Sequence, residues 1–504
     1  MNLKLMLEEK ARQYRKKIAV SLSQNRLSYA DLDEASNKVA NYLVKIGLKR
    51  GDRVAMLLPN SLEFVVVYFG VVKACGIAIP LDVRYKLAEF ASLFNNAQPK
   101  VLVAESLCLQ QLVPHLSRFK SIKQIIEVGS QFKGRFLNYE ELIAAGSIEK
   151  LKVEPEPEDV TYIGYTSGPT NRPRGVMLTH QSLTAEAAIS GDGFKQTSSD
   201  IVILFALPMH HVFGLVVALL GSISKGSKVV ISTGTSPTSL LEFIEKERGT
   251  MFMGVPYIFG LLVNMAEKEG VKYDLSSLRL CISGGASLPD DIALRFKQHF
   301  GLDIVQVWGL TESVASVTCG PVGGPIKLGS AGKVLPGWEV KIVDENGREL
   351  PANHSGEVIV KGPIMKEYYK NAQDTAAAIK DGWLYTGDIG WFDDDGYLFI
   401  TGRKKETIIV KGQNIYHSDI EEVLRTHPKI AEAAVVVIPD KLRGEVVRAV
   451  ISLKAEELAT AEEIRRFCRQ YMADYKLPKQ IIFLDSLPKT ANGEISKEDL
   501  KGDL

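Results

Sequence analysis

The stretch from Tyr162 to His180, YIGYTSGPTNRPRGVMLTH, carries the residue types that hold an anion. Hydroxyl groups, a glycine backbone and a nearby cation can together donate several hydrogen bonds to phosphate oxygens, here from Thr166, Ser167, Gly168, Thr170 and Arg174. The run is not a Walker A sequence, because GxxxxGK followed by Ser or Thr is absent. Taken alone, it is explained about as well by an ordinary surface loop rich in turn-forming residues. The choice between a phosphate-binding loop and an ordinary surface loop therefore depends on the motifs in the rest of the chain.

The elements around this run predict an α/β body. Helical and strand patterns alternate from Leu27 to Pro80, and short segments rich in Val, Ile and Leu continue the rhythm as far as LDIVQVWG. Strands that are apolar on both faces are typical of largely parallel sheets covered by helices. After Gly332 the pattern changes to GWEVKIVDENGREL and GEVIVKG, which predicts an antiparallel hairpin with Asn346 and Gly347 at its turn.

The two ends of the chain differ from this body. The N-terminal segment MNLKLMLEEKARQYRKK lacks the apolar core of a secretion signal and predicts a surface helix. Near Gly402 a compact charged turn, GRKKE, follows one strand and precedes another. Beyond this turn, strand and helix patterns predict a small α+β domain, so we place a domain boundary there.

Composition limits the partners. The 504 residues include 61 basic and 60 acidic side chains, so no global charge favours nucleic acid or an anionic membrane. The five cysteines are scattered and lack CxxC spacing, which supports neither a disulfide framework nor a zinc site and favours a reducing cytoplasm. The two most apolar windows are FVVVYFGVVKACGIAIP and VFGLVVALLGSISKG. Lys73 in the first, and Ser and Gly in the second, interrupt them before they reach the roughly 20 apolar residues of a membrane-spanning helix. We expect those windows to be buried core, with no transmembrane segment.

A series of motifs resembles the adenylate-forming superfamily, which includes acyl-CoA synthetases, luciferases and the adenylation domains of peptide synthetases. The motifs extend over essentially the whole chain and are, in order, LSYADLDEASNKVANYL, GDRVAMLLPNSLEF, the phosphate run, LPMHHVFGL, ISGGASLP, VWGLTES, YTGDIGWFDDDGYLFITGRKKE, VKGQNIYHSDIEEVL and LPKTANGEISK. The resemblance implies an enzyme that joins a carboxylate to the AMP part of ATP, releases pyrophosphate and usually passes the acyl group to a thiol. It implies ATP, Mg²⁺ and the co-substrate CoA as small-molecule partners.

The resemblance assigns nucleotide and metal roles to particular side chains. Trp308, followed by Gly309, offers a flat face to adenine. Thr311 offers a hydroxyl to phosphate, and Glu312 and Thr166 offer oxygens to Mg²⁺. On its own, a glutamate after a strand is in most cases simply a solvated surface residue. These roles therefore depend on the whole series of motifs.

The resemblance also assigns residues to the base and acyl sides of the site. Gly284, Gly285 and Ala286 in ISGGASLP let the backbone come close to the base and the acyl group. His211 matches the family histidine beside the carboxylate channel, whereas a lone histidine in an apolar segment is more often packed in a core.

Residues at and beyond the boundary complete the implied site. Asp388 and Arg403 match the family residues that hydrogen-bond the ribose hydroxyls. Lys405 matches the hinge about which the small domain turns, so that one pose serves adenylation and the other serves thioester formation. In the second pose the region around Gly412 lines the thiol tunnel.

The expected fold class is α/β, with a large N-terminal body of helix-covered, largely parallel sheets, a β-barrel-like subdomain and a small mobile α+β C-terminal domain. The expected AMP-binding and acyl-binding domain covers residues 1–402, the hinge residues 403–406 and the C-terminal mobile domain residues 407–504.

Two regions depart from the family pattern in modest ways. The phosphate run differs from TSGTTGxPKG, because Pro169 removes a hydroxyl and an N–H donor and Asn171 is less free than glycine to expose its backbone. Arg174 replaces a lysine and keeps the charge. The sequence KGQN, around Gly412, stands where many relatives have GGEN, which we expect to shift CoA recognition rather than abolish it.

The C-terminal motif departs more strongly. In the family, LPKTxxGKI places a lysine that bridges the carboxylate and the AMP phosphate, and Glu494 holds that position here. A carboxylate at about 4 Å would repel each anion by ~4 kcal/mol at an effective dielectric near 20, where a lysine would attract by as much. Lys489 already matches a family position of its own and Lys497 is displaced along the chain. We therefore expect the first half-reaction to be impaired.

These observations together predict an AMP-forming acyl-CoA synthetase. Apolar acyl-side segments favour a medium- or long-chain fatty acid as the substrate, while aryl acids and loading of an acyl carrier protein are alternatives. A further alternative is a non-catalytic relative that binds nucleotide or acyl adenylate, because the departures concentrate on ATP phosphates and carboxylate activation. We expect a cytoplasmic protein with no nucleic-acid partner, and a homodimer is left open.

Overall fold

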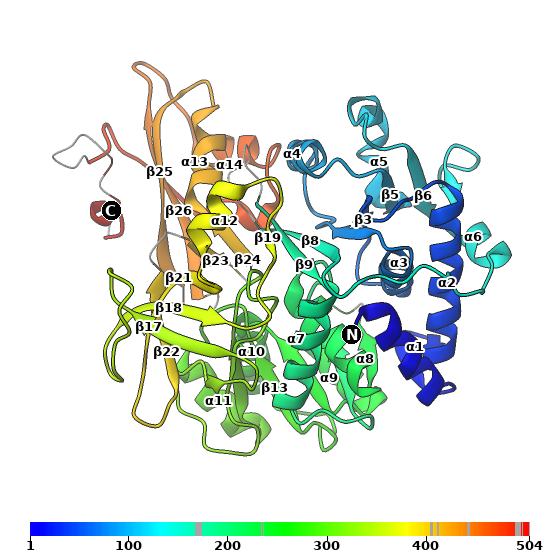
Figure 1. Ribbon diagram of the computed structural model, residues 1–504. Helices are drawn as coiled ribbons and strands as arrows, with labels where there is room; N and C mark the ends of the chain where they lie inside the picture. Colours follow the sequence, from blue (N-terminus) through cyan, green and yellow to red (C-terminus); the bar gives the residue numbers. More distant parts are fainter. Residues whose placement is uncertain are drawn as a thin grey trace.

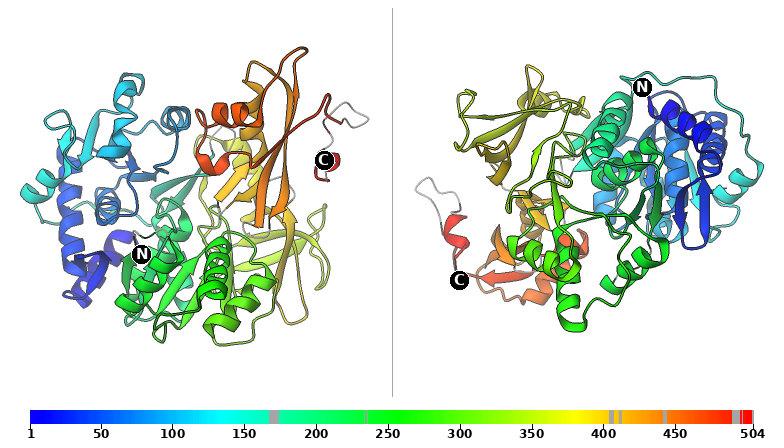
Figure 2. Two further views of the ribbon diagram at one scale, coloured as in Figure 1. Left: turned by 180° about the vertical axis from the view of Figure 1, so that it is seen from behind. Right: turned by 90° about the horizontal axis from the view of Figure 1, so that it is seen from below.

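The computed structural model describes residues 1–166, 174–232, 234, 236–403, 407–410, 413–440, 444–488, 495 and 497–502 (Figure 1). A large body formed by the first four-fifths of the chain carries a smaller C-terminal domain along one side, and helices cover the sheets of the body (Figures 1 and 2). The α/β class predicted from the sequence is confirmed.

One largely parallel sheet contains the strands next to the phosphate run. Its order is β19 (Glu367–Tyr368), β9 (Arg174–Thr179), β8 (Val160–Thr166), β4 (Ile77–Pro80), β3 (Arg53–Leu57), β5 (Val101–Glu105), β6 (Gln124–Val128) and β7 (Leu137–Asn138). Strands β8, β4, β3, β5 and β6 pair in parallel, whereas β8 and β9 form an antiparallel hairpin around the run. Helix α2 (Tyr29–Lys45) precedes its first strand. The helices between its strands are α3 (Leu62–Lys73), α4 (Leu87–Ala97), α5 (Ser106–Gln110), η1 (Val113–Arg118) and α6 (Tyr139–Ala145).

A second sheet contains the strands that lead into the later motifs. Its order is β16 (Lys333–Val334), β15 (Thr318–Cys319), β14 (Ile304–Trp308), β13 (Leu280–Ser283), β12 (Met251–Gly254), β10 (Ile201–Leu204), β11 (Lys228–Ile231), β1 (Ile18–Leu22) and β2 (Asn25–Ser28). The pairs from β11 to β14 are parallel, so the carboxyl ends of these strands meet at one edge. The associated helices are α7 (His180–Gly193), η2 (Phe213–Leu220), α8 (Gly221–Lys225), α9 (Pro237–Glu247), α10 (Pro256–Glu269) and α11 (Asp290–Phe300).

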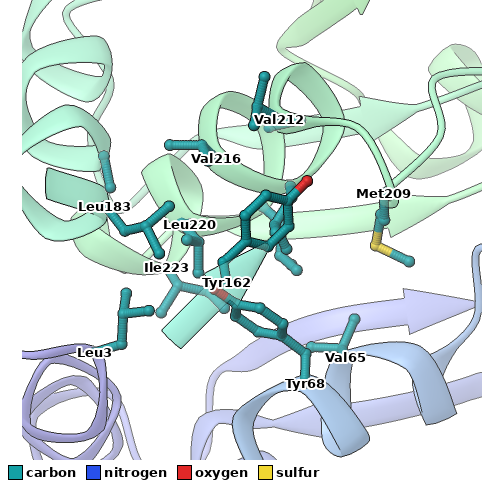
Figure 3. Packing of buried hydrophobic residues seen from close by; sticks show 14 of the residues in the cluster. Leu3, Val65, Tyr68, Tyr162, Leu183, Met209, Val212, Val216, Leu220 and Ile223 are labelled. Atoms are coloured by element: carbon teal, nitrogen blue, oxygen red, sulfur yellow. The ribbon is translucent and has the colours of Figure 1, made fainter. Parts of the chain in front are cut away.

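The core between these sheets contains most of the two apolar windows of the sequence, which form α3 with β4 and η2 with α8. Figure 3 shows the rings of Tyr68 from α3 and Tyr162 from β8 among aliphatic side chains such as Leu220 and Ile223. Every residue of the π-helix η2 is buried, as predicted for this window. Lys73 at the end of α3 is also buried, and its Nζ donates to both the backbone oxygen and the carboxylate of Asp33. No helix in the described part of the chain is long and apolar enough to cross a membrane.

The N-terminal segment forms the predicted helix, α1 (Leu3–Gln13), with one exposed and one buried face. Leu5, Glu9 and Arg12 are exposed, whereas the apolar residues of the other face, Leu3, Met6, Leu7 and Ala11, are buried. Lys4 is buried as well, and its Nζ donates to backbone oxygens and a carboxylate of the segment Leu151 to Glu154. The apolar residues follow helical spacing and form one buried stripe, which the high charge density of the segment conceals.

A third, antiparallel sheet curls beside the body. Its order is β17 (Glu339–Val343), β18 (Gly356–Lys361), β21 (Trp383–Phe392) and β20 (Ile379–Lys380), with β22 (Leu398–Arg403) also pairing with β21. The chain does turn at Asn346 and Gly347, where Gly347 N donates to Asp344 O at 3.0 Å. The connection between the two strands of the hairpin is longer than a tight turn, because β17 pairs along its whole length with β18, which begins only at Gly356. The short helix α12 (Ala372–Ala378) precedes β20.

The C-terminal domain has an α+β arrangement, as predicted. Its elements are β23 (Thr407–Val410), β24 (Gln413–Tyr416), α13 (His417–Arg425), β25 (Ile430–Asp440), β26 (Gly444–Leu453), α14 (Ala461–Cys468), η3 (Asp474–Lys476), β27 (Gln480–Phe483) and η4 (Glu498–Leu500). Strands β25, β26 and β27 form one sheet, and α13 and α14 pack on it through Leu424 and Ile464. The domain therefore has a hydrophobic cluster of its own.

Candidate active site

A cavity of about 290 Å³ opens at the carboxyl-terminal edge of the second sheet, beside the C-terminal domain. Its lining includes seven residues that the sequence singled out, which are His211, Gly285, Ala286, Trp308, Gly309, Thr311 and Asp388. It also includes residues that the sequence did not single out, among them Phe213, Gln306, Ser316 and, from the C-terminal domain, Glu445. Crevices at this edge of parallel sheets are common ligand sites. The fold thus brings motifs that are far apart in the sequence to one cavity.

The loop after β14 has a closed, fixed shape. A Cβ on Gly309 would overlap Ala315 O, so only glycine fits where the loop returns on itself. The loop is closed by a hydrogen bond from Val317 N to Trp308 O at 2.8 Å. Val314 has φ +63°, a region that β-branched residues rarely adopt. This loop holds the Thr and Glu of the VWGLTES motif, and the threonine lines the cavity.

Glu312 is held by the segment before α12. Its Oε1 accepts a hydrogen bond from the Tyr368 hydroxyl at 2.8 Å, and its backbone oxygen accepts from Met365 N at 2.7 Å. Tyr368 lies on β19, which pairs with β9 next to the phosphate run. The orientation of this carboxylate is therefore set by a tyrosine that the sequence reasoning did not identify, since nothing in its spacing distinguishes it from an ordinary strand residue.

The residues predicted for adenine and ribose contact each other. Trp308 Nε1 donates to Asp388 Oδ2 at 2.8 Å, and Asp388 is 1% exposed. Asp388 N in turn donates to Thr386 Oγ1 at 3.0 Å. Arg403 lies opposite Asp388 in the β21–β22 register, so the backbone brings this predicted pair together. The hydrogen bond from its N–H group to Asp388 therefore fixes the orientation of the Trp308 indole ring.

The glycine motif after β13 is tightly enclosed. A Cβ on Gly284 would stand 2.7 Å from Val307 Cγ2 and 3.1 Å from Phe213 Cζ, and Gly285 has φ +79°. Neither position readily accepts a side chain. Ala286 lines the cavity directly after this turn.

His211 lies at the cavity in its neutral form. Burial, with a smaller effect of neighbouring His210, lowers its pKa to about 4. The ring Nδ1 faces Phe213 N at 3.3 Å and accepts its hydrogen bond. At neutral pH this side chain therefore offers a dipole and a hydrogen-bonding nitrogen to a carboxylate, not a positive charge.

Arg174 is engaged away from the cavity lining. It lies opposite Thr166 in the β8–β9 register, its Nε is 2.9 Å from Asp374 Oδ2, and its guanidinium lies over the ring of Tyr368 at 5.7 Å. Several predicted positions lie outside the described residues, namely Ser167, Gly168, Pro169, Thr170, Asn171, Lys405, Gly412, Lys489 and Glu494.

Glu186 on α7 is a buried carboxylate that the sequence reasoning missed. Its Oε1 accepts from Ser316 N and Ser190 Oγ, both at 2.8 Å, and its Oε2 accepts from Trp338 Nε1 at 3.2 Å. Burial raises its pKa to about 8. The available signal was its helical face, which it shares with the buried Leu183 and Ser190. Glu186 thus ties α7 to the end of the loop that lines the cavity.

Comparison with known proteins agrees with this arrangement. Residues 7–369 match the AMP-binding enzyme family, and residues 419–494 match the AMP-binding enzyme C-terminal domain. The chain is 33% identical over 527 residues to a long-chain-fatty-acid–CoA ligase of Bacillus subtilis (strain 168), covering 99% of this chain and 94% of that protein. It is also 33% identical to 4-coumarate-CoA ligase 1 of Narcissus pseudonarcissus over 492 residues, covering 95% of this chain and 89% of that protein.

A solved structure extends the likeness to three dimensions. It is that of a double mutant of o-succinylbenzoate CoA synthetase from Bacillus subtilis bound with its product analogue, with a TM-score of 0.86 and 28% sequence identity. The match covers 98% of this chain and 97% of that one. The chain therefore belongs to the AMP-binding enzyme family and, within it, to the AMP-dependent acyl-CoA synthetases.

Proposed function

We propose that this protein activates a medium- or long-chain fatty acid with Mg·ATP and transfers the acyl group to CoA. The observation that supports this most is the convergence of four separate motifs on one cavity, which brings a base-binding ring, a phosphate-binding hydroxyl and a carboxylate-facing imidazole together. Trp308, Thr311 and His211 carry these three groups.

In the first half-reaction a carboxylate oxygen bonds to the α-phosphorus of ATP while the bond to pyrophosphate breaks, which gives acyl adenylate. Trp308 and Asp388 would hold the nucleoside, and Thr311 would donate its hydroxyl to a phosphate oxygen. Neutral His211 would position the carboxylate without holding it as an ion pair. The chain contributes mainly by positioning and by excluding water from the buried edge.

In the second half-reaction the thiol of CoA loses its proton to solvent and the thiolate sulfur bonds to the acyl carbon. The bond from that carbon to the AMP oxygen breaks, and AMP leaves with that electron pair. We propose that residues 403–406 form the hinge between the body, residues 1–402, and the mobile domain, residues 407–504. The C-terminal domain already contributes Glu445 to the cavity, which supports its taking part in this step.

Magnesium fits the proposed site through one carboxylate. Mg²⁺ in ATP-using enzymes is commonly held by one or two carboxylates together with substrate phosphates. Glu312 would supply such an oxygen, with Thr166 as a second candidate, and the bound ion would neutralise phosphate charge. The Tyr368 hydroxyl already holds Glu312 Oε1, which orients the carboxylate before any ion arrives.

Tyr368→Phe tests this orientation. We expect the half-saturating Mg²⁺ concentration in ATP–pyrophosphate exchange to rise roughly 10- to 150-fold, because the variant loses one hydrogen bond to a charged group, worth about 1.5–3 kcal/mol. The dissociation constant of Mn²⁺, measured in the presence of ATP by electron paramagnetic resonance titration, gives a second readout. The neighbouring Tyr369→Phe is the matched control, and equal metal dependence in both variants would remove Tyr368 from this role.

The apolar acyl side and the likeness to a long-chain-fatty-acid–CoA ligase support the fatty-acid substrate. An aryl acid is the second candidate, because the aromatic ring of Phe213 lines the cavity and a relative of equal identity is named for 4-coumarate. An acyl carrier protein is the alternative to CoA as the acceptor of the acyl group. We also propose a cytoplasmic location, and a homodimer remains open.

Two assays on a carboxylate panel test the function. ATP–pyrophosphate exchange measures the first half-reaction, and synthetic acyl adenylate with CoA measures the second. We expect fatty acyl adenylates of medium or long chain to give the fastest thioester formation, while exchange is slow. If both assays are silent and the protein still binds nucleotide, the chain is a non-catalytic binding relative and the proposal fails.

A further inference from the structure

The C-terminal domain contacts the body through a buried ion pair. Lys476 Nζ on η3 is 2.6 Å from Glu89 Oε1 on α4, and the two side chains are only 8% and 6% exposed. The η3 helix follows α14, whose label stands beside that of α4 in Figure 1. The pair therefore joins the domain to the body at a distance from the chain connection near Gly402.

Glu89 is oriented for this contact by its own helix. Its Oε2 accepts a hydrogen bond from Lys86 N at 2.9 Å, which leaves Oε1 directed to the lysine. The carboxylate is thus fixed before the C-terminal domain docks. A preformed acceptor of this kind selects the position of its partner.

Aromatic rings surround the ion pair on both sides of the interface. Lys476 Nζ lies 5.2 Å from the ring centre of Tyr85 on the body, and the guanidinium of Arg84 lies 4.5 Å from that of Tyr475 on the C-terminal domain. Arg84 is itself held by two hydrogen bonds to buried Asp82. We call Arg84, Tyr85, Glu89, Tyr475 and Lys476 the α4 contact.

In this docked position, the residues on either side of Glu494 in the motif LPKTANGEISK pack on the C-terminal domain itself. Leu487 and Ile495, on either side of that position, pack in a cluster with Val436 and Val450 of β25 and β26, and Lys497 Nζ is 3.1 Å from Glu421 Oε1. These flanking residues are absent from the cavity lining among the described residues, whereas Glu445 is present.

We propose that the α4 contact is the pose-selecting element of this enzyme, and that the docked pose it stabilises serves transfer of the acyl group to the thiol. The inference rests on the proposed function. Lys476 and Glu89 act as positioning residues, since neither lines the cavity. A buried ion pair contributes little net stability, but removing one partner leaves the other charge buried without a counter-charge, which is strongly destabilising. Loss of either partner therefore disfavours this docking while the domain remains folded.

Lys476→Met and Glu89→Gln, with the double variant, test the proposal through separate half-reactions. We expect each single change to slow thioester formation from synthetic acyl adenylate and CoA by at least about 10-fold, while ATP–pyrophosphate exchange changes less than about 3-fold. The double variant strands no charge, so its loss should be smaller than the product of the two single losses. Equal losses in both half-reactions, or multiplicative losses in the double variant, would overturn the proposal.

A second measurement does not depend on turnover. Hydrogen–deuterium exchange should become faster in residues 86–94 and 470–477 of Lys476→Met together, with the rest of the C-terminal domain unchanged. Lys429→Gln, which breaks the exposed ion pair with Glu463 in the same domain, is the matched control and should change neither segment. Unchanged exchange at both segments contradicts the α4 contact, whereas a wild-type protein silent in both half-reactions contradicts the proposed function instead.

Discussion

Glu494→Lys should raise the rate of ATP–pyrophosphate exchange about 100-fold. The change replaces repulsion of the carboxylate and the AMP phosphate, ~4 kcal/mol each at about 4 Å and an effective dielectric near 20, by attraction of the same size. Screening removes part of this difference, and about 2.7 kcal/mol corresponds to a factor of 100 in rate. The measurement is exchange of labelled pyrophosphate into ATP with the best carboxylate of the panel.

The nearby lysine does not substitute for the missing charge. Lys497 forms an ion pair with Glu421 within the C-terminal domain, so its charge is already engaged there. Asp499→Lys is the matched control, since it makes the same charge change at an exposed position of this segment. A similar gain in both variants would trace the effect to overall charge, and no gain in Glu494→Lys would place the block in the phosphate run, at Pro169 and Asn171.

Glu186→Gln should destabilise the protein by about 1–3 kcal/mol and slow ATP–pyrophosphate exchange at least about 10-fold. The two carboxyl oxygens accept from Ser316 N–H and Trp338 Nε1–H, which can only donate. Each oxygen keeps a lone pair for this role when the group is protonated, as its raised pKa predicts at neutral pH. A glutamine has one acceptor oxygen, so its NH₂ group would face a donor and leave it unsatisfied in the interior. The loop that carries Thr311 would then lose the anchor at Ser316.

Chemical denaturation and the exchange assay together check this prediction. Ser190→Ala is the matched control, because it removes the third donor and leaves the two N–H groups satisfied. We expect it to cost less than about 1 kcal/mol and to leave the exchange rate within about 2-fold. If Glu186→Gln is as mild as Ser190→Ala, the carboxylate has no special part in fixing the loop.

The same carboxylate predicts a pH dependence of stability. Burial raises the Glu186 pKa from 4.5 to about 8, so between these values the folded protein keeps a proton that the unfolded chain has lost. The contribution is complete below pH 4.5, declines as pH rises, and is gone above pH 8. The free energy of unfolding should therefore fall from pH 6.5 to 8, with a limiting slope near 1.4 kcal/mol per unit, and Glu186→Gln should flatten this slope.

Two buried histidines act in a separate, lower window with the opposite sign. Burial lowers the pKa of both His180 and His211 from 6.5 to about 4. Their contribution is complete above pH 6.5 and is lost as pH falls toward 4, because the unfolded chain gains protons first. Restricting the measurement to pH 6.5–8 therefore isolates Glu186 from these two groups.

The motifs of this sequence by themselves determined the family, the α/β class and the residue types at the cavity. Short strands apolar on both faces can only be buried in a covered sheet, and glycine at positions such as Gly309 is required by local backbone geometry. Local rules of this kind need no knowledge of distant contacts. They predicted the helix α1 but not its buried apolar stripe, because the many charges of the segment suggested the surface.

Only the tertiary structure decided which groups act on one another. Trp308 and Asp388 share a hydrogen bond across 80 positions of the chain, Tyr368 orients Glu312, and Lys476 meets Glu89 across 387 positions. Such pairs leave no periodic signal, since each partner by itself resembles an ordinary strand, loop or surface residue. The choice of partner is made by sheet order and domain docking, which depend on the packing of the whole chain.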